Sequence, residues 1–333
     1  MAPDAGSSLS GYVKKTLALI IKLTITLTLL YFAVRGANLG LVADRLRRLD
    51  IGWLSAAIAV LGVQAVLSAL RWQRILERCG AAISMQRAIR LTFVAQFFNQ
   101  VLPSTVGGDA ARIWFVAQDG AGWSKAVYSV AIDRIIGVAV LALIVVICIP
   151  ASFELIPDPL ARAGLLIVGL SGVAVPVALI ALGCRQWPLL HRFAILRHFN
   201  TAASLAYDIF TSIQSATWII GLSVVIHALL IVAAWLVAKS VAVPLDALHA
   251  VLIIPPVLLI AALPISIAGW GVRESAMVMA FAYCGLPQAD GLLVSALLGF
   301  AIFVIGIVGG LVWVIGLPGL KLLKPAVTPP RPL

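Results

Sequence analysis

Oppositely charged residues stand close together inside apolar stretches of this 333-residue chain. They form three pairs, Asp109 with Arg112, Asp133 with Arg134, and Arg273 with Glu274. Ionisable side chains in apolar segments are costly and usually face a cavity or a partner charge. A planar guanidinium donates two parallel hydrogen bonds, so arginine suits a phosphate. The pairs therefore favour binding of a phosphate-bearing group. The alternative is that the arginines snorkel, or pair with the acids as structural locks.

The sequence contains few signatures of catalysis. The chain has no HExxH, GxSxG, P-loop or dinucleotide-binding motif. Its four cysteines, Cys79, Cys148, Cys184 and Cys284, are far apart and form no CxxC pair, which disfavours disulfide and metal roles. The acids could support acid–base chemistry, but no nucleophile–base pair accompanies them. We therefore expect no catalytic residue, no metal and no cofactor, and we expect that the chain is not an enzyme.

Two short motifs resemble each other at an offset of 161 residues: LPSTVGGDAAR at 102–112 and LPISIAGWGVR at 263–273. Proline breaks a helix, and glycine allows a tight turn. We predict a turn in each motif, formed by Pro103, Gly107, Gly108, Pro264, Gly269 and Gly271. Unpaired backbone groups at membrane depth are tolerated only inside protein or beside water. Each turn is therefore expected to line a polar cavity.

A new half-helix is expected after each turn, with free amide groups and partial positive charge at its N-terminus. Arg112 and Arg273 lie on these first turns, where they would attract a phosphate. Asn99 precedes the first break and is expected to line the cavity or to bridge helices. The predicted substrate-binding residues are Arg112, Arg273, Asp109, Asp133, Arg134, Glu274 and Asn99. For Asp133 and Arg134, a structural ion pair, for example of Asp133 with Arg112, is slightly favoured over a substrate contact; for His227, a hydrogen-bonded helix contact is favoured over a proton relay.

The composition indicates the elements that hold these residues. Hydrophobic residues make up 62% of the chain and charged residues 11%, and the mean hydropathy is +1.10. A soluble domain has about a quarter charged residues, so lipid is the expected solvent. The net charge of +11 comes from basic residues in short loops, which favours an anionic membrane over nucleic acid.

Apolar runs long enough to cross a bilayer occur at 16–34, 52–70, 125–149, 163–182, 217–238 and 289–317. Two further stretches, 88–120 and 248–285, are apolar but interrupted by the two motifs. We predict an all-α polytopic membrane protein with about six full spans and two re-entrant broken hairpins, which makes eight passes or dips. An odd number of spans separates the hairpins, so the second is inverted relative to the first. This pattern is typical of an inverted internal repeat in transporters.

The basic residues predict the orientation of the chain in the membrane. With a cytoplasmic N-terminus, the inner side receives fifteen lysines and arginines and the outer side six. Both termini are therefore expected in the cytoplasm, although the 35–51 loop fits poorly because it places four arginines outside. We expect residues 1–15 to form a cytoplasmic segment, 16–320 a single transmembrane domain, and 321–333 a disordered tail.

An amphipathic helix is predicted at 188–214, within this domain, because apolar residues recur there at steps of three and four. We expect it to lie along the inner headgroup layer. The alternative is a cytoplasmic helix that packs on the spans.

The motifs LPSTVGGDAAR, SVAIDRIIG (Ser129 to Gly137) and LPISIAGWGVRE occur in this order. The chain thereby resembles the lysylphosphatidylglycerol synthase transmembrane-region family over roughly residues 15–320. In bifunctional relatives this region implies a flippase half that moves aminoacylated phosphatidylglycerol outward, while a soluble domain attaches the amino acid. We expect no such domain here, so the resemblance implies lipid handling without aminoacyl transfer. Ala268 replaces a glycine often found in the family.

From these observations we expect a lipid flippase or transporter in the inner (plasma) membrane. Its cargo would be an anionic phospholipid, a hopanoid or a glycolipid, and lipid-synthesis enzymes are possible partners. The alternatives are a non-catalytic scaffold of a lipid-synthesis pathway and a membrane transferase that acts on a lipid-linked substrate. The sequence leaves the oligomeric state open.

Overall fold

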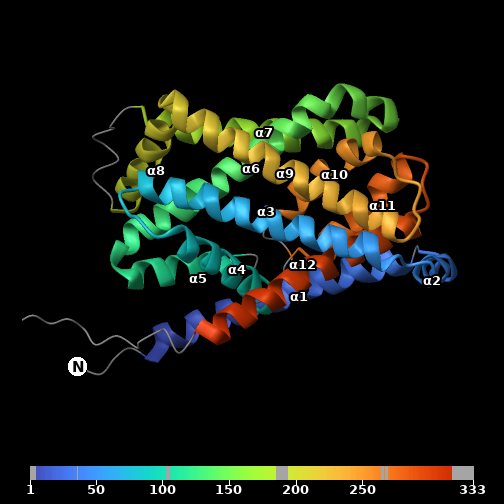
Figure 1. Cartoon of the computed structure of the whole chain (residues 1–333), viewed down its shortest axis with the longest axis horizontal. Coiled ribbons are helices and arrows are strands. Elements are labelled where there is room, and N and C mark those ends of the chain that lie inside the picture. The colour runs from blue at the N-terminus through green and yellow to red at the C-terminus, as the bar shows by residue number, and fades with distance from the viewer. Residues whose placement is uncertain are drawn as a thin grey trace, which may run out of the picture.

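The computed structural model describes residues 5–35, 37–102, 106–184, 194–263, 266 and 269–316, and all their secondary structure is helical. The helices are α1 (Ala5–Arg35), α2 (Leu39–Arg47), α3 (Ile51–Arg78), α4 (Met85–Val101), α5 (Gly107–Val116), the π-helical turn η1 (Ala117–Ala121), α6 (Trp123–Leu155), α7 (Pro159–Leu182), α8 (Ala194–Thr211), α9 (Ile213–Ser240), α10 (Ala247–Ala261), α11 (Val272–Tyr283) and α12 (Gln288–Gly316). The predicted all-α class is confirmed. Figure 1 shows the long helices running side by side along the molecule.

Long apolar helices identify a multi-pass membrane protein. Within the described residues, α3, α6, α7, α9 and α12 are each long and apolar enough to cross a membrane. A sixth span results if residues 20–35 of α1 and the whole of α2 are counted as one bent segment, with an angle of 83° between them. Large apolar side chains such as Phe32, Ile147 and Ile167 are more than half exposed, as expected where lipid covers the protein. Each predicted span falls on one of these helices, except that residue 317 lies outside the described chain.

The two interrupted stretches each form a pair of short helices that pack on each other, α4 with α5 and α10 with α11. The first pair returns to the end from which it starts: Arg87 near the start of α4 forms an ion pair of 2.8 Å with Asp119, just after α5. In the second, Gly271 has a φ of +83° directly before α11. The predicted turn residues Pro103 and Pro264 lie outside the described residues. The helix–break–helix pattern agrees with the prediction, whereas re-entry into a membrane stays a prediction.

Hydrogen bonds between distant segments define the two ends of the bundle. At one end, Lys125 at the start of α6 donates to the Gly80 carbonyl after α3, at 2.8 Å. At the other end, the Asp50 amide before α3 donates to the Ser240 carbonyl at the end of α9, at 2.7 Å. The start of α1 and the end of α12 lie toward the same end of the molecule in Figure 1. This agrees with two termini on one side of a membrane, while their cytoplasmic orientation stays a prediction.

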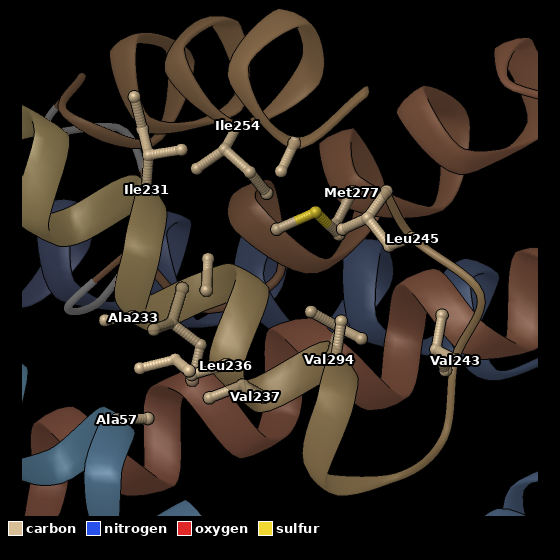
Figure 2. Close-up of a cluster of buried hydrophobic side chains, with 14 of the residues drawn as sticks. Ala57, Ile231, Ala233, Leu236, Val237, Val243, Leu245, Ile254, Met277 and Val294 are labelled. Atoms are coloured by element: carbon tan, nitrogen blue, oxygen red, sulfur yellow. The ribbon is translucent and has the colours of Figure 1, made fainter. Parts of the chain in front are cut away.

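Apolar packing joins the second hairpin to the spans. Figure 2 shows Ile254 of α10 and Met277 of α11 gathered with Val237 of α9 and Val294 of α12. Close backbone approach joins α12 to the first hairpin, because a Cβ on Gly309 would collide with the Phe93 carbonyl of α4. Both hairpins are therefore fixed against α12.

The loop at 35–51, with its four arginines, is organised by α2. Arg45 donates to both carboxylate oxygens of Asp290 at the start of α12, at 3.1 and 3.0 Å, and also to the Ala242 carbonyl. Asp290 is only 1% exposed. At least one of the poorly fitting arginines is therefore neutralised by a buried acid, which reduces its conflict with the charge rule.

The predicted amphipathic helix is present as α8, although residues 188–193 lie outside the described chain. Ala206 and Ile209 on its apolar face are buried against side chains of α3, α6 and α9. Helix α8 therefore packs on the spans through this face, which fits both interpretations. Its position in a headgroup layer stays a prediction.

Candidate functional site

A polar cavity of about 290 Å³ lies among α3, α4, α5, α6, α9 and α10. Its charged lining residues are Arg71, Asp109, Arg112, Asp133 and Arg134, and its neutral polar ones are Gln64, Ser68, Thr92, Gln96, Asn99 and His227. The lining includes Asn99 and Asp109 beside the first break, and Leu258 and Ala262 beside the second. The inner ends of both helix pairs therefore meet at one cavity.

The break between α4 and α5 positions the first group of side chains. The Asn99 Oδ1 accepts a hydrogen bond of 2.8 Å from the Gly108 amide, which satisfies one free donor at the start of α5. A Cβ on Gly108 would collide with the Ala95 carbonyl and lie 2.7 Å from the Asn99 Oδ1. Glycine thus lets α5 begin directly against α4, and this brings Asp109 and Arg112 to the cavity.

Asp109 receives three guanidinium donors. Arg134 donates from Nε at 2.7 Å and from Nη2 at 3.0 Å, while the Nη2 of Arg112 donates to the Oδ1. Asp109 is 6% exposed, whereas 52% of the Arg134 side chain is exposed. Arg134 therefore marks the open side of the cavity, and Asp109 is held behind it.

Asp133 receives the other side of the arginine cluster. Arg71 donates from Nε to the Oδ1 at 2.8 Å, and Arg112 donates from Nη1 to the Oδ2 at 3.4 Å. Arg71 also donates to Ser223 of α9 at 3.0 Å. The Arg112 guanidinium lies 4.9 Å from the centre of the Trp72 ring, within cation–π range. Arg112 thus joins both aspartates, and its predicted pairing with Asp133 is present.

The charges that line this cavity do not cancel. Three arginines face two aspartates, which leaves a net charge of +1 when His227 is neutral. Charge interactions are stronger in a site that excludes water. The arrangement therefore attracts an anion, and the many donors suit phosphate oxygens.

Two contributors to the site, Arg71 and Ser223, were not predicted from the sequence. Arg71 directly follows the predicted span 52–70 and is one of the fifteen basic residues assigned to the inner side, but α3 continues to Arg78 and makes Arg71 a buried residue, 7% exposed. Ser223 carries no sequence signal because serine is common in membrane helices. His227 makes the predicted helix contact through Nε2, which lies 2.9 Å from the Gly137 carbonyl.

Arg273 and Glu274 form a separate cluster that does not line the cavity. Glu274 accepts from Arg273 at 2.7 Å, from Ser295 of α12 at 3.0 Å, and from the Gly271 amide at 2.6 Å. The Arg273 guanidinium lies 5.1 Å from the centre of the Trp270 ring. Arg273 is 7% exposed, and Glu274 is 1% exposed. The sequence placed Arg273 beside the same cavity as Arg112, but the structure holds it in a neutral pair against α12.

The described residues contain no group of three or more His, Cys, Asp or Glu side chains that could hold a metal ion. Both aspartates of the cavity are engaged by arginines, so neither is offered to a cation.

Comparison with known proteins is consistent with this architecture. Residues 19–310 match the family model described as the lysylphosphatidylglycerol synthase TM region. The UPF0104 membrane protein PH1989 of Pyrococcus horikoshii is 28% identical over 171 residues, which cover 50% of this chain and 49% of that protein. The match thus spans about half of the relative's length. No solved structure was found to match the chain.

Proposed function

The chain belongs to the lysylphosphatidylglycerol synthase transmembrane-region family, and from this premise we propose that it moves a lipid with an anionic polar headgroup between membrane leaflets. The observation that carries the proposal is the excess arginine in a cavity among apolar helices. A net positive site among membrane-spanning helices would compensate the cost of bringing a phosphate into the membrane.

The proposed route leaves the lipid tails in the bilayer while the headgroup crosses through the cavity. Arg134, on the open side, would meet the phosphate first, and Arg71 and Arg112 would hold it deeper inside. Asp109 and Asp133 would keep the arginines oriented when the cavity is empty. Arg273 and Glu274, close to the second break, would hold α11 against α12.

The two hairpins would enter the membrane from opposite faces, as the halves of an inverted repeat. Rocking of the halves about a fixed site would then expose the cavity to each leaflet in turn. With the basic loops inside, both termini would be in the cytoplasm. We propose transport without catalysis, because both cavity carboxylates are engaged by arginines and neither is available as a general base.

Leaflet exchange of tail-labelled anionic lipids by the purified full-length protein in vesicles tests the proposal. We expect faster exchange than in protein-free vesicles, and a loss of at least about tenfold in Arg112→Gln, because one charged hydrogen-bonded contact is removed. Arg87→Gln is the matched control, since Arg87 lies outside the cavity and pairs with Asp119 at the foot of the same hairpin. Exchange no faster than in protein-free vesicles would contradict transport and favour the scaffold alternative, and full exchange by Arg112→Gln would contradict a route through the arginine cavity.

A further inference from the structure

A second cavity, of about 480 Å³, lies among α1, α6, α7, α10 and α11. We call it the apolar slot, because its lining is apolar except for Ser152, Ser275 and Tyr283. It shares no lining residue with the arginine cavity. On α10, Val257 lines the slot and its neighbour Leu258 lines the arginine cavity. The slot is therefore a separate site on another face of the second helix pair.

The slot offers few partners to water. The Ser152 Oγ donates to the Cys148 carbonyl at 3.0 Å, and the Ser275 Oγ donates to the Leu29 carbonyl at 3.3 Å. Both serine hydroxyls are thus already engaged by the protein. A buried water needs two to four polar partners, and an apolar cavity without them stays dry. An aliphatic occupant therefore suits the slot better than water does.

The length of the slot fits one acyl chain. Its lining follows α11 from Val272 to Tyr283, and these eleven steps at about 1.5 Å each span roughly 16 Å. One leaflet contributes about 15 Å to a hydrocarbon core of about 30 Å. The lining residues Gly164 and Met279 are exposed. The slot is therefore open to the surrounding lipid and about as long as one leaflet is thick.

An arginine lies at the end of the slot that is farther from the break. The Arg162 Nε donates to the carbonyl of the lining residue Ile156 at 2.6 Å, and its Nη2 donates to the Phe153 carbonyl at 2.8 Å. Within the described chain Arg162 has no ion-pair partner, and the carboxylate of Asp158 caps α7 instead. The Nη1 of this partly exposed arginine keeps its donors free. A guanidinium with free donors beside an apolar slot suits a lipid phosphate.

We propose that the apolar slot holds one acyl chain of a phospholipid, with the phosphate of that lipid on Arg162. The lipid comes from the leaflet at the end of the bundle that carries α2, because α6 and α11 both end there. Its chain runs along α11 toward the break before Val272. The proposal goes beyond transport, since it assigns a bound lipid to a site outside the arginine cavity. This lipid completes the packing between α7 and the second helix pair.

A photoactivatable phosphatidylglycerol with a diazirine at the end of one acyl chain tests the site. The full-length protein is reconstituted in phosphatidylcholine vesicles that contain this probe as a minor component, and the labelled residues are located by mass spectrometry after illumination. We expect label at the deep end of the slot, at Ile260 and Val272, because the chain end lies farthest from Arg162.

Gly164→Phe fills the slot from α7. No atom lies within 4 Å of a Cβ at this position, so the new side chain does not obstruct folding. Gly221→Phe on α9 is the matched control, because it is an exposed helical glycine with the same free space and does not line the slot. We expect the label at Ile260 and Val272 to fall at least about fivefold in Gly164→Phe, since a filled cavity leaves no room for the chain. Gly221→Phe should label like the wild type.

Arg162→Gln tests the phosphate contact. We expect the same label to fall at least about threefold, because a charged hydrogen-bonded contact is lost. Arg47→Gln is the control at the same end of the bundle, since the Arg47 side chain is 81% exposed and pairs with Asp44 on α2. It should leave the label unchanged.

Equal label in the wild type and in Gly164→Phe would show that the probe reports only lipid around the protein, and would overturn the site. A loss in Gly164→Phe without a loss in Arg162→Gln would overturn the phospholipid assignment, because the occupant would then be a lipid held without its phosphate. The label is measured without lipid exchange. Failure of this site would therefore leave the proposed transport standing, and failure of transport would leave the site standing.

Discussion

Arg112 illustrates how a buried arginine is retained among apolar helices. Its guanidinium contacts Asp109 and Asp133 and stacks on the Trp72 ring. Each contact offsets part of the desolvation cost of the charge, although the buried Nε–H has no hydrogen-bond partner among the described residues. Such side chains are fixed by their partners before a ligand arrives, so little reorganisation is needed on binding.

Replacing Arg71 tests whether the arginine–aspartate network is a buried ion-pair network, because loss of a buried partner costs more stability than loss of an exposed one. We expect Arg71→Gln to lower the free energy of unfolding by roughly 3–5 kcal/mol, because it leaves the buried Asp133 with a single weaker arginine contact. Lipid exchange should fall too. Arg74→Gln, one turn further along α3, removes an exposed arginine paired with Glu77 and should cost less than about 1 kcal/mol.

Denaturant unfolding in detergent, with exchange measured in vesicles, compares the two variants directly. Similar stabilities of Arg71→Gln and Arg74→Gln would contradict the assignment of Arg71 to a buried network.

At the scale of elements, the breaks matter because they let two helices begin and end at the cavity. The first turn of α5 lies against α4 so closely that only glycine fits at position 108. The Asn99 side chain, two residues before the end of α4, then accepts a hydrogen bond from the first turn of α5. The break is therefore a packing junction, and it orients Asp109 and Arg112 together.

Gly108→Ala tests this junction. The added methyl group would meet the Ala95 carbonyl and the Asn99 cap, so we expect a loss of about 1–3 kcal/mol from overpacking and a reduced rate of lipid exchange. Gly221→Ala on α9 is the control, because nothing lies within 4 Å of its new Cβ and alanine favours a helix. The melting temperature, followed by intrinsic fluorescence, should fall for Gly108→Ala alone. A melting curve of Gly108→Ala like that of the wild type would count against the tight junction.

At the scale of the whole molecule, the two ends of the bundle differ in what they expose. One end carries the loop between α3 and α4 and the start of α6, and the other carries α2 and the start of α12. If the long helices span a membrane, these ends lie on opposite faces. The proposed transport depends on this separation, because a headgroup must pass from one face to the other.

Cysteine labelling measures the separation. In a background with all four cysteines replaced by serine, Ala82→Cys before α4 and Ala43→Cys on α2 each place one thiol at an exposed position. An impermeant maleimide added to intact cells should label Ala43→Cys only, and Ala82→Cys should react only after the membrane is opened. Labelling of both variants in intact cells would contradict the proposed topology, and the reverse pattern would invert the predicted orientation.

Much of this architecture could be predicted from the sequence alone. The apolar runs predicted the long helices, and the motifs LPSTVGGDAAR and LPISIAGWGVR predicted the two breaks, because both signals depend on neighbouring residues. The charges Asp109, Arg112, Asp133 and Arg134 were also recognised as a site. A charge inside an apolar run is costly wherever the helix packs, so it indicates function or pairing before any fold is known.

Only the tertiary structure decided which charges meet. Arg71 and Asp133 are 62 residues apart, and Arg45 and Asp290 are 245 apart. Arg273, which the motif placed beside Arg112, is held by Glu274 and Ser295 instead. A membrane helix is apolar on its lipid face and on its packed face alike, so the hydrophobic pattern does not reveal its rotation. Rotation and packing determine which side chains face the cavity, and they follow from the fit of all the helices together.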